Sequence, residues 1–82
     1  MQSGRLSGVD IFEETDRFTV IVELPGAERD DISVHLQTNA LEIVAYAGTR
    51  EYRRHIDLGF PVKSDPVITG NNGIFEIVLG KV

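Results

Sequence analysis

The stretch Phe18-Thr19-Val20-Ile21-Val22-Glu23-Leu24-Pro25-Gly26 decides the fold class of this chain. Four of its apolar residues occupy every second position and fall on one face of an extended chain: Phe18, Val20, Val22 and Leu24. A period of two, with a high content of β-branched residues, is typical of a half-buried β-strand. Pro25-Gly26 is a strong turn signal, so we expect the strand to end there.

Similar patterns recur on both sides of this stretch. Upstream, Asp10–Glu14 holds a short apolar run that ends in charge. Downstream, short β-type segments follow at 32–37, 41–46, 52–58, 67–69 and 74–79. Asn71-Asn72-Gly73 predicts a hairpin turn between the last two, because Asn and Gly tolerate positive φ. Pro61 and Pro66 indicate that residues 59–66 form a loop.

The pattern predicts an all-β fold in a single domain. No segment shows the sustained apolar stripe of a helix, and the helix-like piece at residues 27–31 is too short to stand alone. About seven short strands separated by turns predict a β-sandwich of two sheets. The 82-residue length allows one domain, which we expect over residues 9–82 after a flexible, Gly- and Ser-rich lead-in over residues 1–8.

The composition argues against several classes of function. The chain has no cysteine, which rules out disulfides and cysteine-based zinc sites and fits the reducing cytoplasm, where we expect the protein to reside. Its net charge of −5 argues against nucleic acid as a partner, because phosphate binding needs a positive surface. No segment has the apolar length that spans a bilayer, so we expect no membrane partner.

The titratable residues do not have the spacing of a catalytic or metal site. His35 and His55 are the only histidines, and both fall on the polar side of their strands, so we interpret them as surface residues. A catalytic triad or a zinc site would need them close together. The acidic turn at Asp30-Asp31 lacks the alternating oxygen ligands of a calcium loop. We therefore expect no enzyme activity, no cofactor and no metal.

Four segments in order resemble the small heat shock proteins. The resemblance rests on Glu23-Leu24-Pro25-Gly26 with Asp31-Ile32-Ser33-Val34, on Asn39–Ile43, on Tyr52–Leu58 with Arg54 at the family's arginine position, and on Asn71–Leu79. Together they span nearly the whole chain. The resemblance implies an α-crystallin domain, an immunoglobulin-like β-sandwich that holds partly unfolded proteins without ATP and dimerises through β-edges. It also implies a groove at one sheet edge that takes an I-x-I motif from a neighbouring subunit.

The chain departs from the family pattern in several places. The segment between Tyr46 and Tyr52 is very short, whereas many prokaryotic relatives carry a long strand-swapping loop there, so swapped and edge-paired dimers both stay open. Phe75 stands where the family usually has Leu, and the strand around Val67 is short. The chain shows neither the long apolar N-terminal arm nor the I-x-I tail of the family. We expect a core domain that forms a dimer, or a monomer–dimer mixture.

Two sets of candidate binding residues follow from the resemblance and the alternation. The first is a partner or client groove at a sheet edge, formed by Ile32, Val34, Leu36 and Val67. The other interpretation of these residues is that they belong to the core, as alternating apolar positions usually do. The second set is a dimer interface at Tyr52 and Arg54. Because Arg54 shares the apolar parity of its strand, we expect it to be partly buried and to need an acidic partner.

Two functions stay open at this point. The first is an ATP-independent molecular chaperone (a holdase) that binds partly unfolded proteins and prevents aggregation. The alternative is a CS-type co-chaperone or adaptor β-sandwich that docks a specific folded partner, which the short segment between Tyr46 and Tyr52 favours. Arg54 and the Asn71–Glu76 ending favour the chaperone. An immunoglobulin-like adhesion domain would usually carry a Cys…Trp…Cys core, which is absent here.

Overall fold

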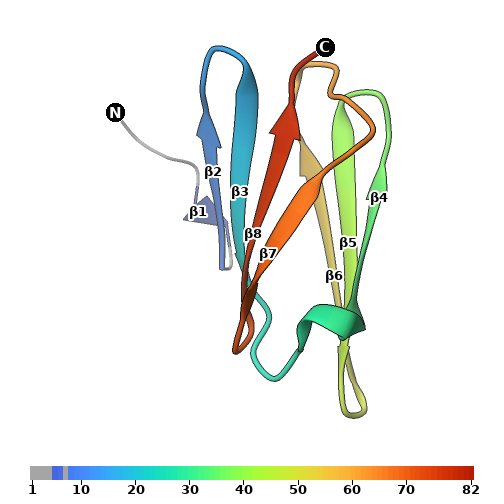
Figure 1. Cartoon of the computed structure of the whole chain (residues 1–82). Coiled ribbons are helices and arrows are strands. Elements are labelled where there is room, and N and C mark those ends of the chain that lie inside the picture. The colour runs from blue at the N-terminus through green and yellow to red at the C-terminus, as the bar shows by residue number, and fades with distance from the viewer. Residues whose placement is uncertain (1–4, 7) are drawn as a thin grey trace.

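The computed structural model describes residues 5–6 and 8–82, which form two antiparallel sheets packed face to face (Figure 1). The sheets have the strand orders β1-β2-β3-β8-β7 and β4-β5-β6. The strands are β1 Arg5–Leu6, β2 Val9–Glu13, β3 Arg17–Glu23, β4 Ile32–Leu36, β5 Ala40–Ala47, β6 Arg50–Asp57, β7 Val67–Asn71 and β8 Ile74–Gly80. Among the described residues the only helical segment is the 3-10 turn η1, Arg29–Asp31. The predicted two-sheet β-sandwich is confirmed.

Strands β2 to β8 correspond to the seven predicted segments, and β1 is an additional strand of two residues. Arg5 pairs with Asp10 and Leu6 with Val9, so β1 adds a short strand beside β2. Both residues belong to the expected lead-in. The rest of that lead-in up to residue 7, namely residues 1–4 and 7, lies outside the described residues.

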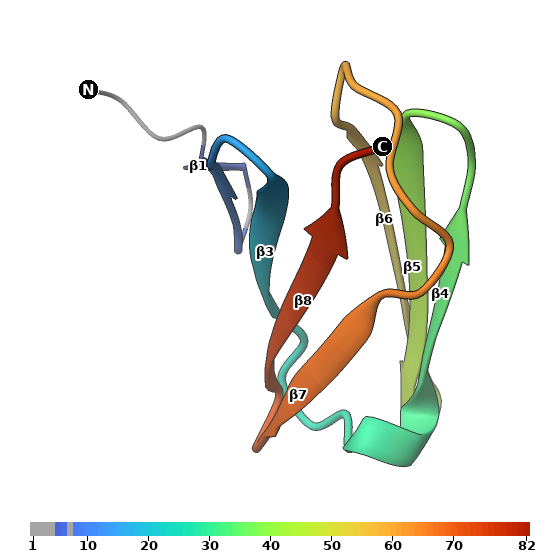
Figure 2. The ribbon, with the colours of Figure 1, turned by 45° about the horizontal axis from the view of Figure 1, so that its top comes forward.

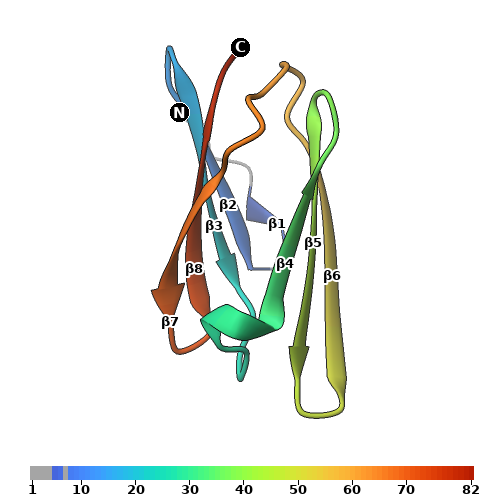
Figure 3. The same ribbon diagram turned by 45° about the vertical axis from the view of Figure 1, so that its right-hand side comes forward.

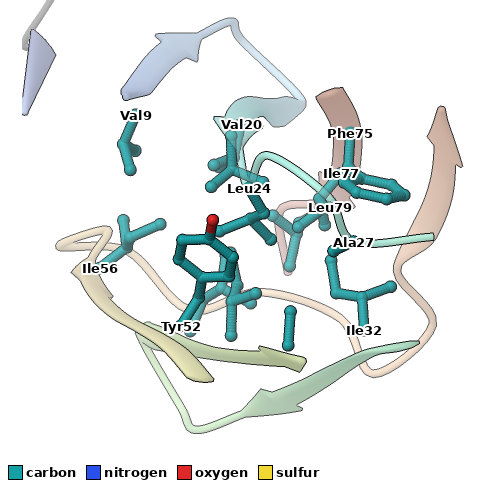
Figure 4. Close-up of a cluster of buried hydrophobic side chains, with 14 of the residues drawn as sticks. Val9, Val20, Leu24, Ala27, Ile32, Tyr52, Ile56, Phe75, Ile77 and Leu79 are labelled. Atoms are coloured by element: carbon teal, nitrogen blue, oxygen red, sulfur yellow. The ribbon is translucent and has the colours of Figure 1, made fainter. Parts of the chain in front are cut away.

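The core fills the space between β3 and β8 on one sheet and β5 on the other (Figure 4). The register of β3 and β8 sets Phe18 beside Leu79, Val20 beside Ile77 and Val22 beside Phe75. These six side chains are at most 2% exposed. Their counterparts on β5 are fully buried: Leu41, Ile43 and Ala45. Burial of one large apolar side chain contributes roughly 1.5–3 kcal/mol. The alternation read from the sequence therefore supplies most of what holds the two sheets together.

The turn after β3 and the β7–β8 hairpin turn meet at one end of the sandwich. Their contact explains why residue 73 of the hairpin is a glycine. The Leu24 N–H donates to the Gly73 carbonyl over 2.6 Å. Gly73 has a φ of 80°, and a Cβ there would lie 2.9 Å from the Leu24 carbonyl oxygen. Asn72 also has a positive φ, 55°. The hairpin turn predicted at residues 71–73 is present, and its glycine serves both the turn and the close approach of the chain leaving β3.

The predicted loop at residues 59–66 crosses between the sheets and is anchored to the chain after β8. Val62 forms a β-bridge with Lys81. The Lys81 ammonium donates to Glu13 over 2.7 Å, and it lies 5.0 Å from the Phe18 ring centre and 4.9 Å from that of Phe60. A cation over aromatic faces is attracted by their quadrupoles. Lys81 thus ties the loop to the β2–β3 hairpin.

Each sheet ends in strands that have a neighbour on one side only. In the five-stranded sheet these are β1 and β7, and in the three-stranded sheet they are β4 and β6. Strands β4 and β7 lie on one side of the sandwich, whereas β2, with the short β1, and β6 lie on the opposite side (Figures 2 and 3). We refer to these as the β4/β7 side and the β2/β6 side. They are where the sandwich offers strand edges to another chain.

Candidate protein-binding edges

Strand β4 forms one margin of the β4/β7 side. Its residues Ile32, Val34 and Leu36 all face the core, as their alternation predicted. Ile32 is buried, whereas Val34 and Leu36 pack against the core and stay half-buried. Within the described part of the chain, β4 pairs only with β5. The core interpretation and the edge interpretation of Ile32, Val34 and Leu36 therefore both apply. The side chains of β4 close the core, while the main chain of its outer edge stays unpaired.

Strand β7 forms the other margin, but its apolar residues point in different directions. Val67 pairs with Val78 on the outer face of the five-stranded sheet and is 58% exposed. Ile68 pairs with the buried Ile77 and packs against the core, half-buried. The structure therefore does not bring Val67 onto the face that Val34 and Leu36 share. Ile68 occupies that position, and counting back from the turn at residues 71–73 could have identified it.

The β4 and β7 margins approach each other near η1. This turn directly precedes β4, and it contacts β7. The sequence predicted that residues 27–31 are too short to form a helix on their own, and the single 3-10 turn agrees with this. Asp31 accepts a hydrogen bond from the Glu28 N–H over 2.9 Å, so the acidic residues cap this turn. The turn sets where β4 begins relative to β7.

On the β2/β6 side, Tyr52 is fixed in the core of the sandwich. Its side chain is 8% exposed, and its hydroxyl donates to the Pro25 carbonyl over 2.7 Å. Arg50 donates to the same hydroxyl over 3.3 Å, and this hydrogen bond raises the pKa of Arg50. The Arg54 guanidinium lies 5.6 Å from the ring centre. The Arg54 guanidinium therefore packs over the ring of Tyr52, which is held in place by its own hydrogen bonds.

Arg54 is half-buried, as its parity predicted, but the acidic partner expected for it is not found among the described residues. One of its terminal nitrogens donates to the Arg53 carbonyl over 2.8 Å. Its Nε is buried and has no hydrogen-bond partner within residues 5–6 and 8–82. A buried donor without a partner costs roughly 1–3 kcal/mol. Arg54 thus holds an unmet donor on β6, an edge strand of its sheet. Because this nitrogen is covered, the side chain would have to turn outward to meet an acceptor from another chain.

Apart from Val44 and Tyr46, the outer face of the three-stranded sheet is polar and carries exposed ion pairs. Arg53 lies 3.0 Å from Glu51 and 3.9 Å from Glu42, and His55 lies 3.3 Å from Asp57. Exposed pairs of this kind contribute little to stability. His35 and His55 are both exposed, as expected. Across the described residues, no three His, Cys, Asp or Glu side chains are grouped so that they could hold a metal, and no helix could span a membrane.

The fold and its open sides can be compared with known proteins. No family model and no curated protein sequence matches the chain. The Del-C4 mutant of hsp14.1 from Sulfolobus solfatataricus P2 is 30% identical with a TM-score of 0.73, over 89% of this chain and 73% of that chain. The chain belongs to the small heat shock protein family. The family resemblance read from the sequence is therefore confirmed, and with it the α-crystallin domain of a chaperone family.

Other small heat shock proteins share the same sandwich. Heat shock protein 16.0 from Schizosaccharomyces pombe is 26% identical with a TM-score of 0.77, over 96% of this chain and 76% of that chain. The hspA protein from Xanthomonas axonopodis is 24% identical with a TM-score of 0.75, over 89% of this chain and 90% of that chain. The chain thus shares its fold with small heat shock proteins from these organisms.

Proposed function

We propose that this small heat shock protein binds partly unfolded proteins without ATP and prevents their aggregation. The proposal rests on the free strand edges and half-buried apolar residues of the β4/β7 side. Both sheets end there in a strand with one free edge, and the half-buried residues Val34, Leu36 and Ile68 belong to these two strands. An unfolding protein exposes what such edges bind, namely unpaired main chain and apolar side chains.

An extended client segment would add to β4 or β7 as a further strand. Main-chain hydrogen bonds would hold it, and every second side chain would contact Val34 and Leu36 or Ile68. Main-chain pairing is independent of sequence, so many clients fit. Because each client segment must be ordered on binding, the affinity for one segment is low. Of the residues predicted for this site, Ile32 supports the strand from the core and Val67 lies at its outer rim.

A dimer formed along the edge of β6 completes the proposed function. Strands β5 and β6 are joined by a tight turn in which Gly48 has a φ of 64°, so no loop is present between them that could be exchanged with a partner. This favours an edge-paired dimer over a swapped one. Tyr52 and Arg54 would lie in that interface, where the partner supplies the acceptor that the Arg54 Nε lacks. The cytoplasm, a reducing compartment, is the proposed location.

The direct test is a heat-aggregation assay with an unrelated model client, without ATP, followed by light scattering. The proposal predicts suppressed scattering at near-stoichiometric ratios of folded domain to client. No suppression from a folded domain would reject holdase activity for this chain. In that case a pull-down that recovers one folded partner would support the adaptor alternative.

Paired variants locate the activity on the β4/β7 side. Val34→Thr with Leu36→Thr removes apolar surface from β4 while keeping residues that suit a strand. Tyr46→Ser is the matched control. Tyr46 is a 51% exposed apolar residue of β5, and it lies on the outer face of the three-stranded sheet, away from the β4 edge. We expect the double variant to lose several-fold in suppression and the control to keep it. Equal activity in both folded variants would place the client elsewhere.

A further inference from the structure

The outer face of the five-stranded sheet carries a mainly apolar row, of which the holdase proposal uses only Val67, at the rim of the client site. The register aligns Phe12 of β2 with Thr19 of β3, Thr19 with Val78 of β8, and Val78 with Val67 of β7. Phe12 is 42% exposed and Val67 is 58% exposed, while Thr19 and Val78 are partly exposed. These four residues, which we call the apolar row, run across four strands. They lie on the side of the sheet that faces away from the core, because their neighbours along β3 and β8 are buried: Phe18, Val20, Ile77 and Leu79. Figure 3 shows this sheet on the left, with β7 and β8 at its outer margin.

Opposite charges flank the apolar row on its two sides. Two residues further along the strands, Glu76 of β8 lies beside Ile21 of β3. Two residues in the other direction, Gly80 of β8 pairs with Arg17 of β3. The stem of Lys63 lies over Gly80, since a Cβ built on this glycine would be 3.3 Å from the Lys63 Cδ. Arg17 is balanced by Glu14, so the unpaired charges beside the row are Lys63 on one side and Glu76 on the other.

Lys63 and Glu76 are the charges on this face that have no partner. Neither forms an ion pair or a side-chain hydrogen bond with any of the residues that the structure describes, and both are exposed. Arg17, by contrast, is held by Glu14 at 2.6 Å. The loop that carries Lys63 is fixed, because the Lys63 N–H donates to the Gly80 carbonyl over 2.8 Å. The position of the lysine stem over β8 is thus set by the backbone.

We propose that two copies of this chain associate through this face, about a two-fold axis that lies along the apolar row. Such an axis places each residue of the row opposite the same residue of the second copy. It also places the Glu76 side of one copy over the Lys63 side of the other. This follows because a position two residues before the row in one copy faces the position two residues after the row in the second copy. Glu76 then lies opposite Gly80 of the second copy, where the Lys63 ammonium can reach it, and the symmetry makes this pair twice.

The charges favour a second copy over a client segment as the occupant. A client would need its own matching arrangement of apolar and charged residues, whereas the two-fold axis matches this face to itself. Four strands about 4.8 Å apart and rows about 7 Å apart make the face roughly 20 Å on a side. That is less than the roughly 800 Å² per partner of a standard interface. The association is therefore weak, and it depends on protein concentration.

This contact goes beyond the proposed function because it uses a different surface from the β6 edge. A chain with two different two-fold interfaces assembles beyond a dimer, either into a closed tetramer or into an open array. The edge dimer responds to Arg54 and the face contact to Lys63 and Glu76. Each interface can therefore fail in experiment without the other, and loss of the face contact leaves the holdase proposal intact.

A charge-reversal cycle tests the pairing by sedimentation at a series of concentrations. Lys63→Glu and Glu76→Lys each place like charges opposite one another, so each should weaken the face contact several-fold. The double variant restores both pairs and should recover wild-type association. Net charge alone predicts another order, because Lys63→Glu makes the chain more negative than −5 and Glu76→Lys makes it less negative. Stronger association of Glu76→Lys, or no recovery in the double variant, would overturn the proposal.

Two further variants complete the test. Arg29→Glu makes the same charge change as Lys63→Glu at an exposed residue of η1, and it should leave the association unchanged. Because the chain has no cysteine, Thr19→Cys introduces a single thiol close to the proposed axis. A short bifunctional maleimide should join two such chains far more efficiently than chains with Ser33→Cys on the outer face of the other sheet. Equal cross-linking of the two variants would contradict the proposed face.

Discussion

Among single residues, Arg54 is the one whose unmet hydrogen bond supports the proposed dimer interface. The sequence predicted its half-buried position, because it shares the parity of Tyr52 and Ile56 on an otherwise apolar strand face. It also predicted an acidic partner, which the described residues do not provide. The parity of a residue follows from local alternation, whereas the partner of a charge depends on side chains far away in sequence. The unmet Nε is therefore a result that only the three-dimensional arrangement could give.

Replacement of Arg54 separates dimerisation from folding. Arg54→Ala removes the Nε, which has no partner among the described residues, together with the hydrogen bond to the Arg53 carbonyl and the contact with the Tyr52 ring. These contacts come from a partly exposed side chain, so the monomer should lose little stability, while the dimer should weaken by about 1.5–3 kcal/mol, the range for hydrogen bonds to charged groups. Arg53→Ala is the control, because Arg53 lies on the opposite, exposed face of the same strand. Sedimentation and urea unfolding at low concentration measure the two effects. An unchanged dimer mass for Arg54→Ala would remove Arg54 from the interface.

Two glycines give a matched pair for backbone strain. Gly48 and Gly73 both have positive φ, 64° and 80°, but a Cβ on Gly48 meets nothing within 4 Å, whereas one on Gly73 meets the Leu24 carbonyl at 2.9 Å. We expect Gly48→Ala to cost about 1 kcal/mol from strain alone. Gly73→Ala should cost about 2–3 kcal/mol, because the turn after β3 must also shift. Urea unfolding measures both, and equal losses would mean that the close approach contributes nothing.

At the scale of strands and turns, local pattern predicted where each strand lies but not always which way it faces. In β3 and β8 every second residue is clearly apolar, so the buried faces followed directly from the alternation. Strand β7 reads Val67-Ile68-Thr69, and two adjacent apolar residues leave its parity undecided. The register with β8, which the turn at residues 71–73 fixes, shows that Ile68 faces the core and Val67 the outside. The pairing of β1 with β2 has no comparable sequence signal.

The different orientation of these two residues predicts different effects of mutation. Ile68→Thr removes half-buried apolar surface from the β4/β7 side, so it should lower both stability, by about 1 kcal/mol, and client binding. Val67→Thr changes an exposed residue and should leave stability within about 0.5 kcal/mol of the wild type. Its effect should appear instead in self-association through the apolar row. Light scattering with a model client and sedimentation distinguish these outcomes, and greater loss of client binding in Val67→Thr would reverse our assignment.

Across the whole molecule, different surfaces are proposed to serve different partners. The β4/β7 side is proposed for clients, the β6 edge for a dimer and the outer face of the five-stranded sheet for a further contact. Fold class and family followed from the sequence because alternation, turns and four short segments are local features. The division of surfaces did not, since it depends on strand order and on which strands are left at the edges.

The central claim is that clients add to the strand edges of the β4/β7 side. The most direct test is amide hydrogen exchange of the folded domain with and without a heat-unfolded model client, read out strand by strand. We expect protection to increase in β4 and β7, whose outer edges are open, and to stay unchanged in β3 and β8, whose amides are already paired within the sheet. Client-induced protection confined to β6, or to neither edge of the β4/β7 side, would contradict it.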